Sequence, residues 1–530
     1  MARLLHELIL EQADCRPTAI AVTHRQSSLD YAALASQIQA VGRGLRTLGL
    51  NRTERVAVYL PKRLETVVAL FGVALAGGVF VPINPLLKPE QVAYILRDCN
   101  VRILITAGDR AALLEPVLTD CPDLHTLVLT DDAIAAPQRP RHWQTLGWPA
   151  LLDAVNSPPP ARVIDQDMAA ILYTSGSTGK PKGVVLSHRN MLAGAHSVAE
   201  YLGNRANDRI LAVLPFSFDY GLSQLTTALV AGARAVLMDY LLPRDVVATV
   251  AREGITGLAA VPPMWVQLAA LEWPAAAADS LRYFTNSGGA MPRATLAALR
   301  RALPKTTPYL MYGLTEAFRS TYLPPEEIER RPDSIGKAIP NAEILVVRED
   351  GTPCAPGEPG ELVHRGSLVA LGYWNDPAKT AERFRPAPGQ NPGLPLPELA
   401  VWSGDTARMD EDGFLYFIGR KDDMIKTSGY RVSPTEVEEI LYGSGQIAEA
   451  AALGIPHPAL GQAIVAVIKP LRDTIDESAL IAHCKLHLPN FMVPLRIVAR
   501  SSDLPRNPNG KIDRKALVEE LRALFPEPPP

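Results

Sequence analysis

Short apolar runs that alternate with helical patterns constrain the fold of this 530-residue chain more than any other feature. The strand-like runs occupy 55–60, 78–84, 102–106 and 126–130, and they resume at 169–174, 209–215, 234–239 and 257–262. Helical patterns such as 31–48 and 89–98 separate them. Buried strands that alternate with helices favour sheets covered by helices on both faces, so we expect an α/β fold.

A chain of this length is too long for one ordinary domain. Near 419–423 a glycine meets a run of charges, and the remaining residues have the composition of a compact α+β unit. We therefore expect a large N-terminal domain at 1–420 and a small C-terminal domain at 421–530. The expected irregular connectors and tail are 136–162, 385–397 and 525–530.

Charge and hydropathy narrow the setting in which the chain works. A net charge of −3 without basic runs gives no reason to expect a nucleic-acid partner. The uncharged stretch 66–87 is long enough to span a bilayer, but Gly77 and Gly78 split it and two prolines follow. A helix, a tight turn and a buried strand fit it better. With five scattered cysteines, we expect a cytoplasmic protein without stable membrane insertion.

The stretch YTSGSTGKPKGVVLSH, residues 173–188, follows an apolar strand and has the composition of an anion-binding loop. Its glycines allow a close backbone approach, and its hydroxyls, N–H groups and lysines all attract phosphate. Lys180 is followed by Pro181, so the G-x-x-x-x-G-K-[ST] spacing of kinases and GTPases is missing. A flexible Gly/Ser surface loop would not explain two lysines flanking a proline directly after a strand.

This loop resembles the signature of the adenylate-forming superfamily, which includes acyl-CoA synthetases, amino-acid adenylation domains and luciferases. Further motifs follow in the order typical of that superfamily: AGGVFVPINP (76–85), NSGGAM (286–291), YGLTEA (312–317), GELVHRGSLVALGYWN (360–375), WSGD (402–405), GRKDDMIKTSGYRVSPTEVE (419–438), LPNFMVP (488–494) and NPNGKIDR (507–514). Residues 313–327 resemble both AMP-forming acyl-CoA ligases of the exosortase-associated type and stand-alone enzymes that load an amino acid such as proline onto a carrier.

The resemblance implies an AMP-forming acid–thiol ligase. Such an enzyme uses ATP and Mg²⁺ to convert a carboxylic acid into an acyl-adenylate and pyrophosphate. It then transfers the acyl group to the thiol of CoA or of a carrier-protein phosphopantetheine. A stand-alone amino-acid adenylating enzyme and, less favoured, a luciferase-like oxidase are the alternatives. Lys182, Glu316, Asp405 and Lys511 argue against a binding protein without activity.

The resemblance also implies a nucleotide site. Its expected members are Thr174, Ser175, Gly176, Ser177, Thr178, Gly179, Gly288, Gly289, Ala290, Tyr312, Asp405 and Arg420. Residues 174–182 would hold the β- and γ-phosphates, Tyr312 would pack on adenine, and Asp405 would accept both ribose hydroxyls. Ser403 stands where threonine is commoner, but the hydroxyl is kept.

The expected catalytic residues are Lys511, Glu316, Thr315 and Lys182. Thr315 would touch the α-phosphate, and Glu316 resembles the Mg²⁺ ligand, as suits a hard cation. Lys511 would stabilise the charge that develops between carboxylate and α-phosphate. The resemblance makes the C-terminal domain mobile, with Asp422 as its hinge and Gly429 lining the thiol tunnel.

The acid pocket is expected to include Phe218, Asp219, Ser223, Ser287 and Met311, with Ala260, Arg319 and Ser320 beside them. Their sizes disfavour very long fatty acids. Amino-acid adenylation domains carry the same Phe-Asp pair and bind the substrate's α-ammonium group with the aspartate. Asp219 therefore hints at an amino acid, unless it only caps a helix that starts at Tyr220. Arg319 would either pair with a second acidic group or lie outside the pocket.

Overall fold

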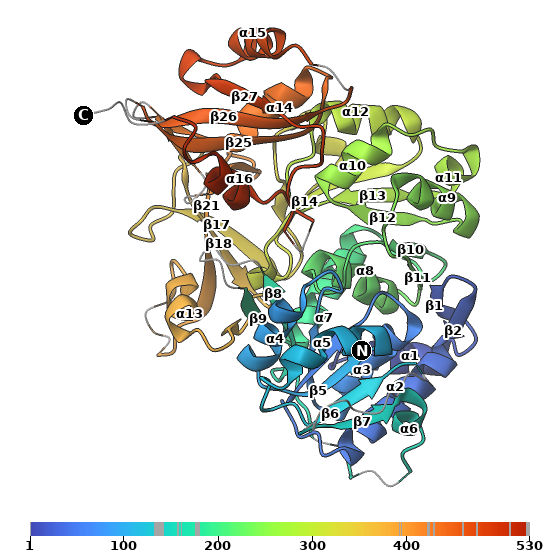
Figure 1. Cartoon of the computed structure of the whole chain (residues 1–530). Helices are drawn as coiled ribbons and strands as arrows, with labels where there is room; N and C mark the ends of the chain where they lie inside the picture. The colour runs from blue at the N-terminus through green and yellow to red at the C-terminus, as the bar shows by residue number, and fades with distance from the viewer. Residues whose placement is uncertain are drawn as a thin grey trace.

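In this computed structural model the described residues are 2–131, 142–155, 158–160, 162–174, 181–391, 393, 395–420, 424–427, 430–457, 460–472, 475–507 and 510–525. They form four sheets with helices between and around them (Figure 1). The orange-to-red C-terminal part lies at the top of this view, and the blue N-terminal part lies at the bottom.

The first sheet carries the phosphate loop. In spatial order its described strands are β19 (Gly372–Tyr373), β9 (Lys182–Ser187), β8 (Met168–Thr174), β4 (Val79–Pro82), β3 (Arg55–Tyr59), β5 (Val101–Thr106), β6 (Thr126–Leu129) and β7 (Gln144–Gly147). The helices of this region are α1 (Glu7–Cys15), α2 (Tyr31–Thr47), α3 (Leu64–Ala76), α4 (Pro89–Asp98), α5 (Gly108–Leu118) and α6 (Trp148–Leu152). The strand and helix predictions for this region are thus confirmed, with bounds shifted by a few residues.

The second sheet runs, over the described residues, through β16 (Lys337–Ala338), β15 (Thr321–Leu323), β14 (Thr307–Tyr312), β13 (Tyr283–Asn286), β12 (Gly257–Ala260), β10 (Arg209–Ala212), β11 (Arg234–Leu237), β1 (Ile20–His24) and β2 (Ser27–Asp30). Its helical segments are α7 (His188–Tyr201), α8 (Asp219–Val230), α9 (Pro243–Glu253), α10 (Pro262–Ala269), α11 (Ala275–Ser280), α12 (Arg293–Ala302), η1 (Thr315–Ala317) and η2 (Pro325–Glu327). Because β10 to β14 are parallel neighbours, the loops after them meet at one edge of the sheet.

A third sheet contains β17 (Ala342–Val347), β18 (Gly360–Gly366), β21 (Leu399–Met409), β20 (Phe384–Pro386) and β22 (Leu415–Arg420), with α13 (Pro377–Arg383) beside it. The C-terminal sheet contains β24 (Tyr430–Val432), β23 (Ile425–Thr427), β26 (Gly461–Pro470), β25 (Ile447–His457) and β27 (Arg496–Ala499). Its helical segments are α14 (Pro434–Gly443), α15 (Glu477–His487), η3 (Asn490–Met492) and α16 (Arg514–Leu521). This arrangement confirms the expected fold class of mixed sheets with flanking helices plus a smaller α+β unit.

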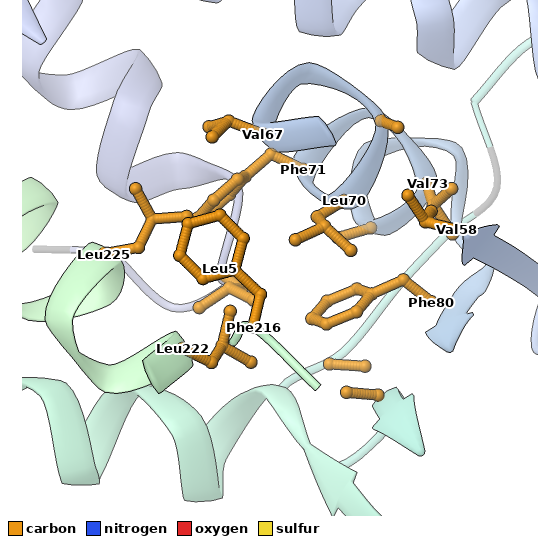
Figure 2. Close-up of a cluster of buried hydrophobic side chains, with 14 of the residues drawn as sticks. Leu5, Val58, Val67, Leu70, Phe71, Val73, Phe80, Phe216, Leu222 and Leu225 are labelled. Carbon is orange, nitrogen blue, oxygen red and sulfur yellow. The ribbon is translucent and has the colours of Figure 1, made fainter. Parts of the chain in front are cut away.

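The two large sheets share one apolar core. Figure 2 shows Leu5, Phe71 and Phe216 packed with Leu222 and Leu225 of α8. All five side chains are buried, so α8 is held firmly at its apolar face. Burying a large aliphatic or aromatic side chain contributes about 1.5–3 kcal/mol. This core therefore gives α8, which carries Asp219 at its first residue, a fixed position.

The uncharged stretch 66–87 is a helix, a turn and a strand, as predicted. Helix α3 ends where Gly77 adopts a positive φ of 85°, and the chain turns directly into β4. A residue with a Cβ would be strained there. Among the described residues, none of the helices has the length and hydropathy that a membrane crossing demands. The cytoplasmic location stays a prediction.

Two predicted connectors contain regular structure. Within 136–162, β7 and α6 form an additional strand and a short helix. Within 385–397, the first residues belong to β20, because Arg385 and Pro386 pair with β21 at its edge. Prolines tolerate an edge position, and this is why composition alone was misleading here. The predicted domain boundary at 420/421 and the hinge Asp422 fall at residues 421–423, outside the described residues.

The C-terminal unit has its own hydrophobic clusters and touches the large unit at a few places. Helix α14 contacts α12, and β25 contacts α10. Across this contact the backbone N–H of Arg293 donates to Glu439 Oε1 at 2.9 Å. These contacts hold the segment around Lys511 over the edge of the second sheet.

Candidate active site

The candidate site lies at the carboxyl ends of the parallel strands of the second sheet. Thr315 and Glu316 follow β14, the glycines at 288 and 289 follow β13, and Asp219 begins the helix after β10. Ligands of open α/β sheets bind at this kind of edge. Residues from positions almost 100 apart in the chain are brought together here by the parallel register.

The anion loop connects two antiparallel strands. In the β8–β9 pair Thr174 lies opposite Lys182, so both residues stand at the base of a hairpin loop. A P-loop would instead lead from a strand into a helix. The other predicted phosphate-binding residues, 175–179, lie outside the described residues. The geometry therefore places the first and last members of the loop and supports the exclusion of the P-loop class.

Lys182 and Glu316 converge on one side chain that the sequence reasoning did not single out. The Tyr373 hydroxyl donates to Glu316 Oε1 at 2.6 Å. The Lys182 ammonium group lies 5.3 Å from the centre of the Tyr373 ring, a cation–π distance. Burial, followed by the charge of Lys379, lowers the pKa of Lys182. Tyr373 thus joins the predicted phosphate-binding lysine to the predicted metal-binding carboxylate.

Asp405, Tyr312 and Arg420 form a second cluster. The Tyr312 hydroxyl donates to Asp405 Oδ2, and Arg420 Nε lies 3.1 Å from Asp405 Oδ1. Arg420 and Asp405 are direct cross-strand partners on β21 and β22. Burial raises the pKa of Asp405, although Arg420 opposes the shift. The Ser403 hydroxyl accepts from the Asp405 backbone N–H at 3.1 Å, so serine performs the positioning role at this site.

A buried histidine supports the ring expected to pack on adenine. His364 on β18 stacks on Tyr312 with ring centres 5.9 Å apart and an angle of 25° between the planes. Burial lowers the pKa of His364 to about 3, so this imidazole is neutral at physiological pH. Neither ring nitrogen has a hydrogen-bond partner among the described residues. The histidine therefore acts as a flat, uncharged support.

Lys511 reaches the site from the C-terminal unit. Its ammonium group lies 5.7 Å from the centre of the Phe218 ring. Gly288 has a positive φ of 81°, and a Cβ on it would lie 3.3 Å from Lys511 Cε. Burial lowers the pKa of Lys511, with Asp219 opposing the shift. The side chain of Lys511 is thus inserted beside the strand edge where Thr315 lies. By contrast, Gly289 and Ala290 are exposed.

Asp219 is already paired inside the protein. Its Oδ2 accepts from Arg319 Nη1 at 3.0 Å, and its Oδ1 accepts from the Thr315 hydroxyl at 3.2 Å. The side chains of Asp219 and Arg319 are 4% and 3% exposed, so the ion pair is buried. The helix begins at Asp219 itself, with Phe218 as the N-cap, and Asp219 makes no capping hydrogen bond. The structure therefore overturns the capping alternative.

A small cavity of about 20 Å³ lies beneath α8. Ser223 and Met311 line it as predicted, and Arg319 lines it too. Among the described residues, the remaining lining residues are Val198, Leu202, Ile210, Tyr220, Gln224, Thr227, Gly257, Ala259, Tyr283 and Thr285. Phe218, Asp219 and Ser287 are buried nearby but do not line it. Such a cavity is large enough for a water molecule or the end of a small ligand.

Some residues of the site were missed. Tyr373 belongs to the motif at 360–375, and its position beside Lys182 on β9 depends on the β19–β9 pairing. Gln224 and Thr227 belong to no motif. Both lie on the same face of α8 as Ser223, at positions one and four residues further along, so helical spacing from Ser223 would have predicted them. The predicted thiol-tunnel residue Gly429 lies outside the described residues.

Comparison with known proteins gives concordant matches along the chain. The family model for AMP-binding enzymes matches residues 9–374, and the model for the C-terminal domain of these enzymes matches residues 436–511. A sulfoacetate–CoA ligase of Cupriavidus necator is 32% identical over 93% of this chain and 92% of its own length.

Two further similarities point the same way. A dimodular nonribosomal peptide synthase of Bacillus subtilis is 31% identical over 97% of this chain, which spans 21% of that much longer protein. The crystal structure of the anthranilate CoA ligase AuaEII with anthranoyl-AMP superposes with a TM-score of 0.86 at 26% identity, covering 98% of this chain and 97% of that one.

Proposed function

Because the chain belongs to the AMP-binding enzyme family and is an ATP-dependent AMP-forming ligase of the acyl-CoA synthetase type, we propose that adenylation is performed by Thr315, Lys511, Asp405 and Lys182 in the geometry described above. The observation that carries the proposal is the insertion of Lys511 next to Gly288 and Phe218. This lysine lies far from Gly288 and Thr315 in sequence and reaches the edge of the second sheet at which both lie.

In the first half-reaction a carboxylate oxygen of the acid attacks the α-phosphorus of ATP. The bond to the bridging oxygen breaks, and pyrophosphate leaves with its electron pair. Lys511 stabilises the negative charge that develops between the two reactants, and the Thr315 hydroxyl, which donates to Asp219 Oδ1 in this structure, would turn to donate to the α-phosphate. Asp405, held by Tyr312 and Ser403, would accept the ribose hydroxyls and fix the position of the α-phosphate.

The residues present also fit Mg²⁺. Glu316 Oε1 accepts from Tyr373, which leaves its second carboxylate oxygen for a hard cation. When bound, Mg²⁺ neutralises charge on the phosphates. Lys182 stands beside the same tyrosine ring, so cation and ammonium groups would together hold the leaving pyrophosphate.

In the second half-reaction a thiol attacks the acyl carbonyl carbon of the adenylate, and AMP leaves as the C–O bond of the mixed anhydride breaks. We propose CoA as the thiol, because the similar full-length ligases carry CoA in their names. The phosphopantetheine of a separate carrier protein is the second candidate, favoured by the match to a peptide synthase. Rotation of the C-terminal domain about Asp422, with passage of the thiol past Gly429, remains part of this proposal.

The activated acid is proposed to be small. The cavity beneath α8 is small and partly polar, and Arg319 is one of its lining residues. Asp219 retains its role in the proposal, but as the partner of Arg319 and Thr315. An amino acid would have to displace Arg319 from Asp219 before its ammonium group could bind there. The geometry thus supports a simple small acid over an amino acid.

ATP–pyrophosphate exchange over a panel of amino acids and short, medium and aryl acids would test the proposal. With the best acid, Lys511→Ala should lower exchange by about 100-fold or more, because the developing charge loses its counter-charge. The same variant should still form thioester from a chemically supplied acyl-adenylate and CoA. Lys485→Ala, at an exposed lysine of α15, is the matched control and should retain both activities.

Equal loss of both half-reactions in Lys511→Ala would contradict the assignment of this lysine to adenylation alone. Transfer to a carrier protein but not to CoA would replace the proposed acceptor with the second candidate.

A further inference from the structure

We propose that Arg319 is the specificity determinant of the acid pocket and that it binds a second carboxylate, so that the substrate is a short dicarboxylic acid. This inference rests on the proposed function, because it concerns the acid that is adenylated. The guanidinium group of Arg319 has two hydrogen-bonding sides. One side is occupied by Asp219, and the other side has no partner among the described residues.

The unpaired side of Arg319 has the geometry of a carboxylate receptor. Nη1 donates to Asp219 Oδ2 at 3.0 Å, whereas the buried Nε and Nη2 have no hydrogen-bond partner in the part of the chain that the structure describes. These two N–H groups form the edge of the guanidinium fork that binds both oxygens of a carboxylate. Because the side chain is 3% exposed, bulk solvent does not solvate this edge. Buried charged donors without partners are costly, so the edge is built for an acceptor.

The surrounding charges also favour an anion. Arg319 pairs with Asp219, and the charges that act on Lys511 are those of Asp219, Arg420, Asp405 and Glu316. Next to the free edge of the Arg319 guanidinium, a substrate ammonium group would be repelled, whereas a second carboxylate would be attracted. The reacting carboxylate would face Lys511, and the far carboxylate would face Arg319. Thr315 donates to Asp219, the carboxylate that also pairs with Arg319.

The backbone before Arg319 is strained in a way that orients it. Phe318 has a positive φ of 53°, which is unusual for a bulky residue. Its side chain is fully buried, and it packs where a Cβ on Gly194 would lie 2.3 Å away from Phe318 Cδ1. The Tyr220 ring lies 4.8 Å from the guanidinium carbon of Arg319. Strain held in place by packing is typical of ligand sites, and here it fixes the direction of the fork.

The pocket around the fork is short and partly polar. Besides Arg319, Gln224 Oε1 and Thr227 Oγ1 are buried without hydrogen-bond partners among the described residues, and both residues line the cavity. Met311 lines the cavity too. A cavity of about 20 Å³ takes only the end of a small ligand, here the far carboxyl group, so short spacers between the two carboxylates are tested first. Malonate, succinate and glutarate therefore span the range of lengths to be tested.

Exchange kinetics with these three diacids would test the inference. Each diacid is compared with its half-amide, whose far end is uncharged. It is also compared with the monocarboxylic acid in which a methyl group replaces the far carboxyl group. Glycine, β-alanine and proline serve as ammonium-bearing competitors. For at least one diacid, kcat/KM should exceed that of both analogues by about 100-fold or more, because the amide oxygen gives the buried charged donors only an uncharged acceptor and the methyl group gives them none.

Substitution of Arg319 would then separate charge from geometry. Arg319→Lys keeps the charge but removes the fork, so the diacid-to-half-amide ratio of kcat/KM should fall by about tenfold or more. Arg234→Lys is the matched control, because it alters another arginine–carboxylate pair of the same sheet, with Glu253, and should keep the ratio. The double variant Asp219→Asn/Arg319→Gln removes both buried charges together, so neither is left unpaired, and its melting temperature would report whether it folds. Its diacid-to-half-amide ratio of kcat/KM should also fall.

Three results would overturn the inference. A monocarboxylic acid or an amino acid as the best substrate would do so while leaving the proposed function intact. An unchanged diacid-to-half-amide ratio in Arg319→Lys would assign the arginine a structural role only. Exchange with no acid of any class would overturn the proposed function together with this inference.

Discussion

The nucleotide side and the acid side of the site differ in the kind of charged group that has buried atoms without hydrogen-bond partners. On the nucleotide side this group is a carboxylate: Asp405 accepts from Tyr312 and is paired with Arg420, but its Oδ1 accepts no hydrogen bond from the described residues. On the acid side this group is a guanidinium: Nε and Nη2 of Arg319 have no hydrogen-bond partner among the described residues. The first side would therefore offer an acceptor to the nucleotide, which is common to all substrates, whereas the second side would offer donors to the particular acid.

The largest expected effect on the nucleotide side is that of Asp405→Ala. It removes the acceptor proposed for the ribose hydroxyls and leaves Arg420 without its cross-strand partner. The kcat/KM for ATP in pyrophosphate exchange should fall by about 100- to 1,000-fold, the size of losing charge-assisted hydrogen bonds. Glu411→Gln, an exposed change on the turn between β21 and β22, should have no effect. A loss below tenfold would mean that Asp405 does not contact the nucleotide.

Tyr373→Phe should have a smaller effect on the same side. The ring remains beside Lys182, but the hydrogen bond to Glu316 is lost. A carboxylate that is no longer oriented should raise the Mg²⁺ concentration needed for half-maximal exchange by about tenfold. Titration of exchange activity with Mg²⁺ would measure this. Tyr416→Phe, which removes a hydroxyl that donates to Asp410, is the control. Equal Mg²⁺ requirements in both variants would contradict the proposed role of Tyr373.

His364 should make the stability of the protein depend on pH. Its pKa is lowered to about 3, so below the unfolded value near 6.5 the unfolded chain binds a proton that the folded chain does not. Stability should therefore fall as pH drops from 6.5, by about 1.4 kcal/mol per pH unit for this histidine. His364→Phe keeps a ring behind Tyr312 and should remove the part of the stability loss at low pH that comes from this histidine.

Urea unfolding at pH 7 and pH 5 would measure the change in the free energy of unfolding. His487→Phe, at an exposed position of α15, is the control. The same pH dependence in His364→Phe and in the unmodified protein would contradict the buried neutral state of His364.

The smallest expected effect is on the acid side. Thr227→Val replaces a buried hydroxyl that lacks a partner among the described residues with a methyl group of similar shape. Stability should hardly change, because no internal hydrogen bond is lost. The KM for the acid should rise by about three- to tenfold, while the KM for ATP stays constant.

The neighbouring change Thr226→Val removes a hydroxyl that donates to Ser223 O at 3.3 Å, and it should cost stability instead. A raised KM for ATP in Thr227→Val would contradict the assignment of Thr227 to the acid side alone.

Much of the fold followed from local pattern. The alternation of apolar runs and helical segments predicted β3 to β6 and α2 to α4, because periodicity and turn residues act over a few positions. The elements β7 and α6 were missed inside a proline-rich stretch. They are stabilised by pairing with β6 and packing against α2, which are contacts that no local pattern records.

The candidate site divides in the same way. Residues in compact motifs, such as Thr315 and Glu316, could be predicted because their neighbours in sequence carry the signal. Tyr373 could not be assigned a role, because its place depends on the antiparallel pairing of β19 with β9. Asp219 was predicted to bind an ammonium group, and Arg319 was predicted to pair with a second acidic group or to lie outside the pocket. That these two residues, 100 positions apart, pair with each other was not predicted.

The sequence by itself determined the order of elements, the anion loop that is not a P-loop, and the class of reaction. Each of these properties is carried by short motifs, whose residues lie close together in the chain. Only the tertiary structure decided that Asp219 pairs with Arg319 and that the guanidinium edge of Nε and Nη2 lacks a partner among the described residues. The physical reason is that parallel strands bring the loops after β10 and β14 to one edge, and burial there makes each unpaired donor significant.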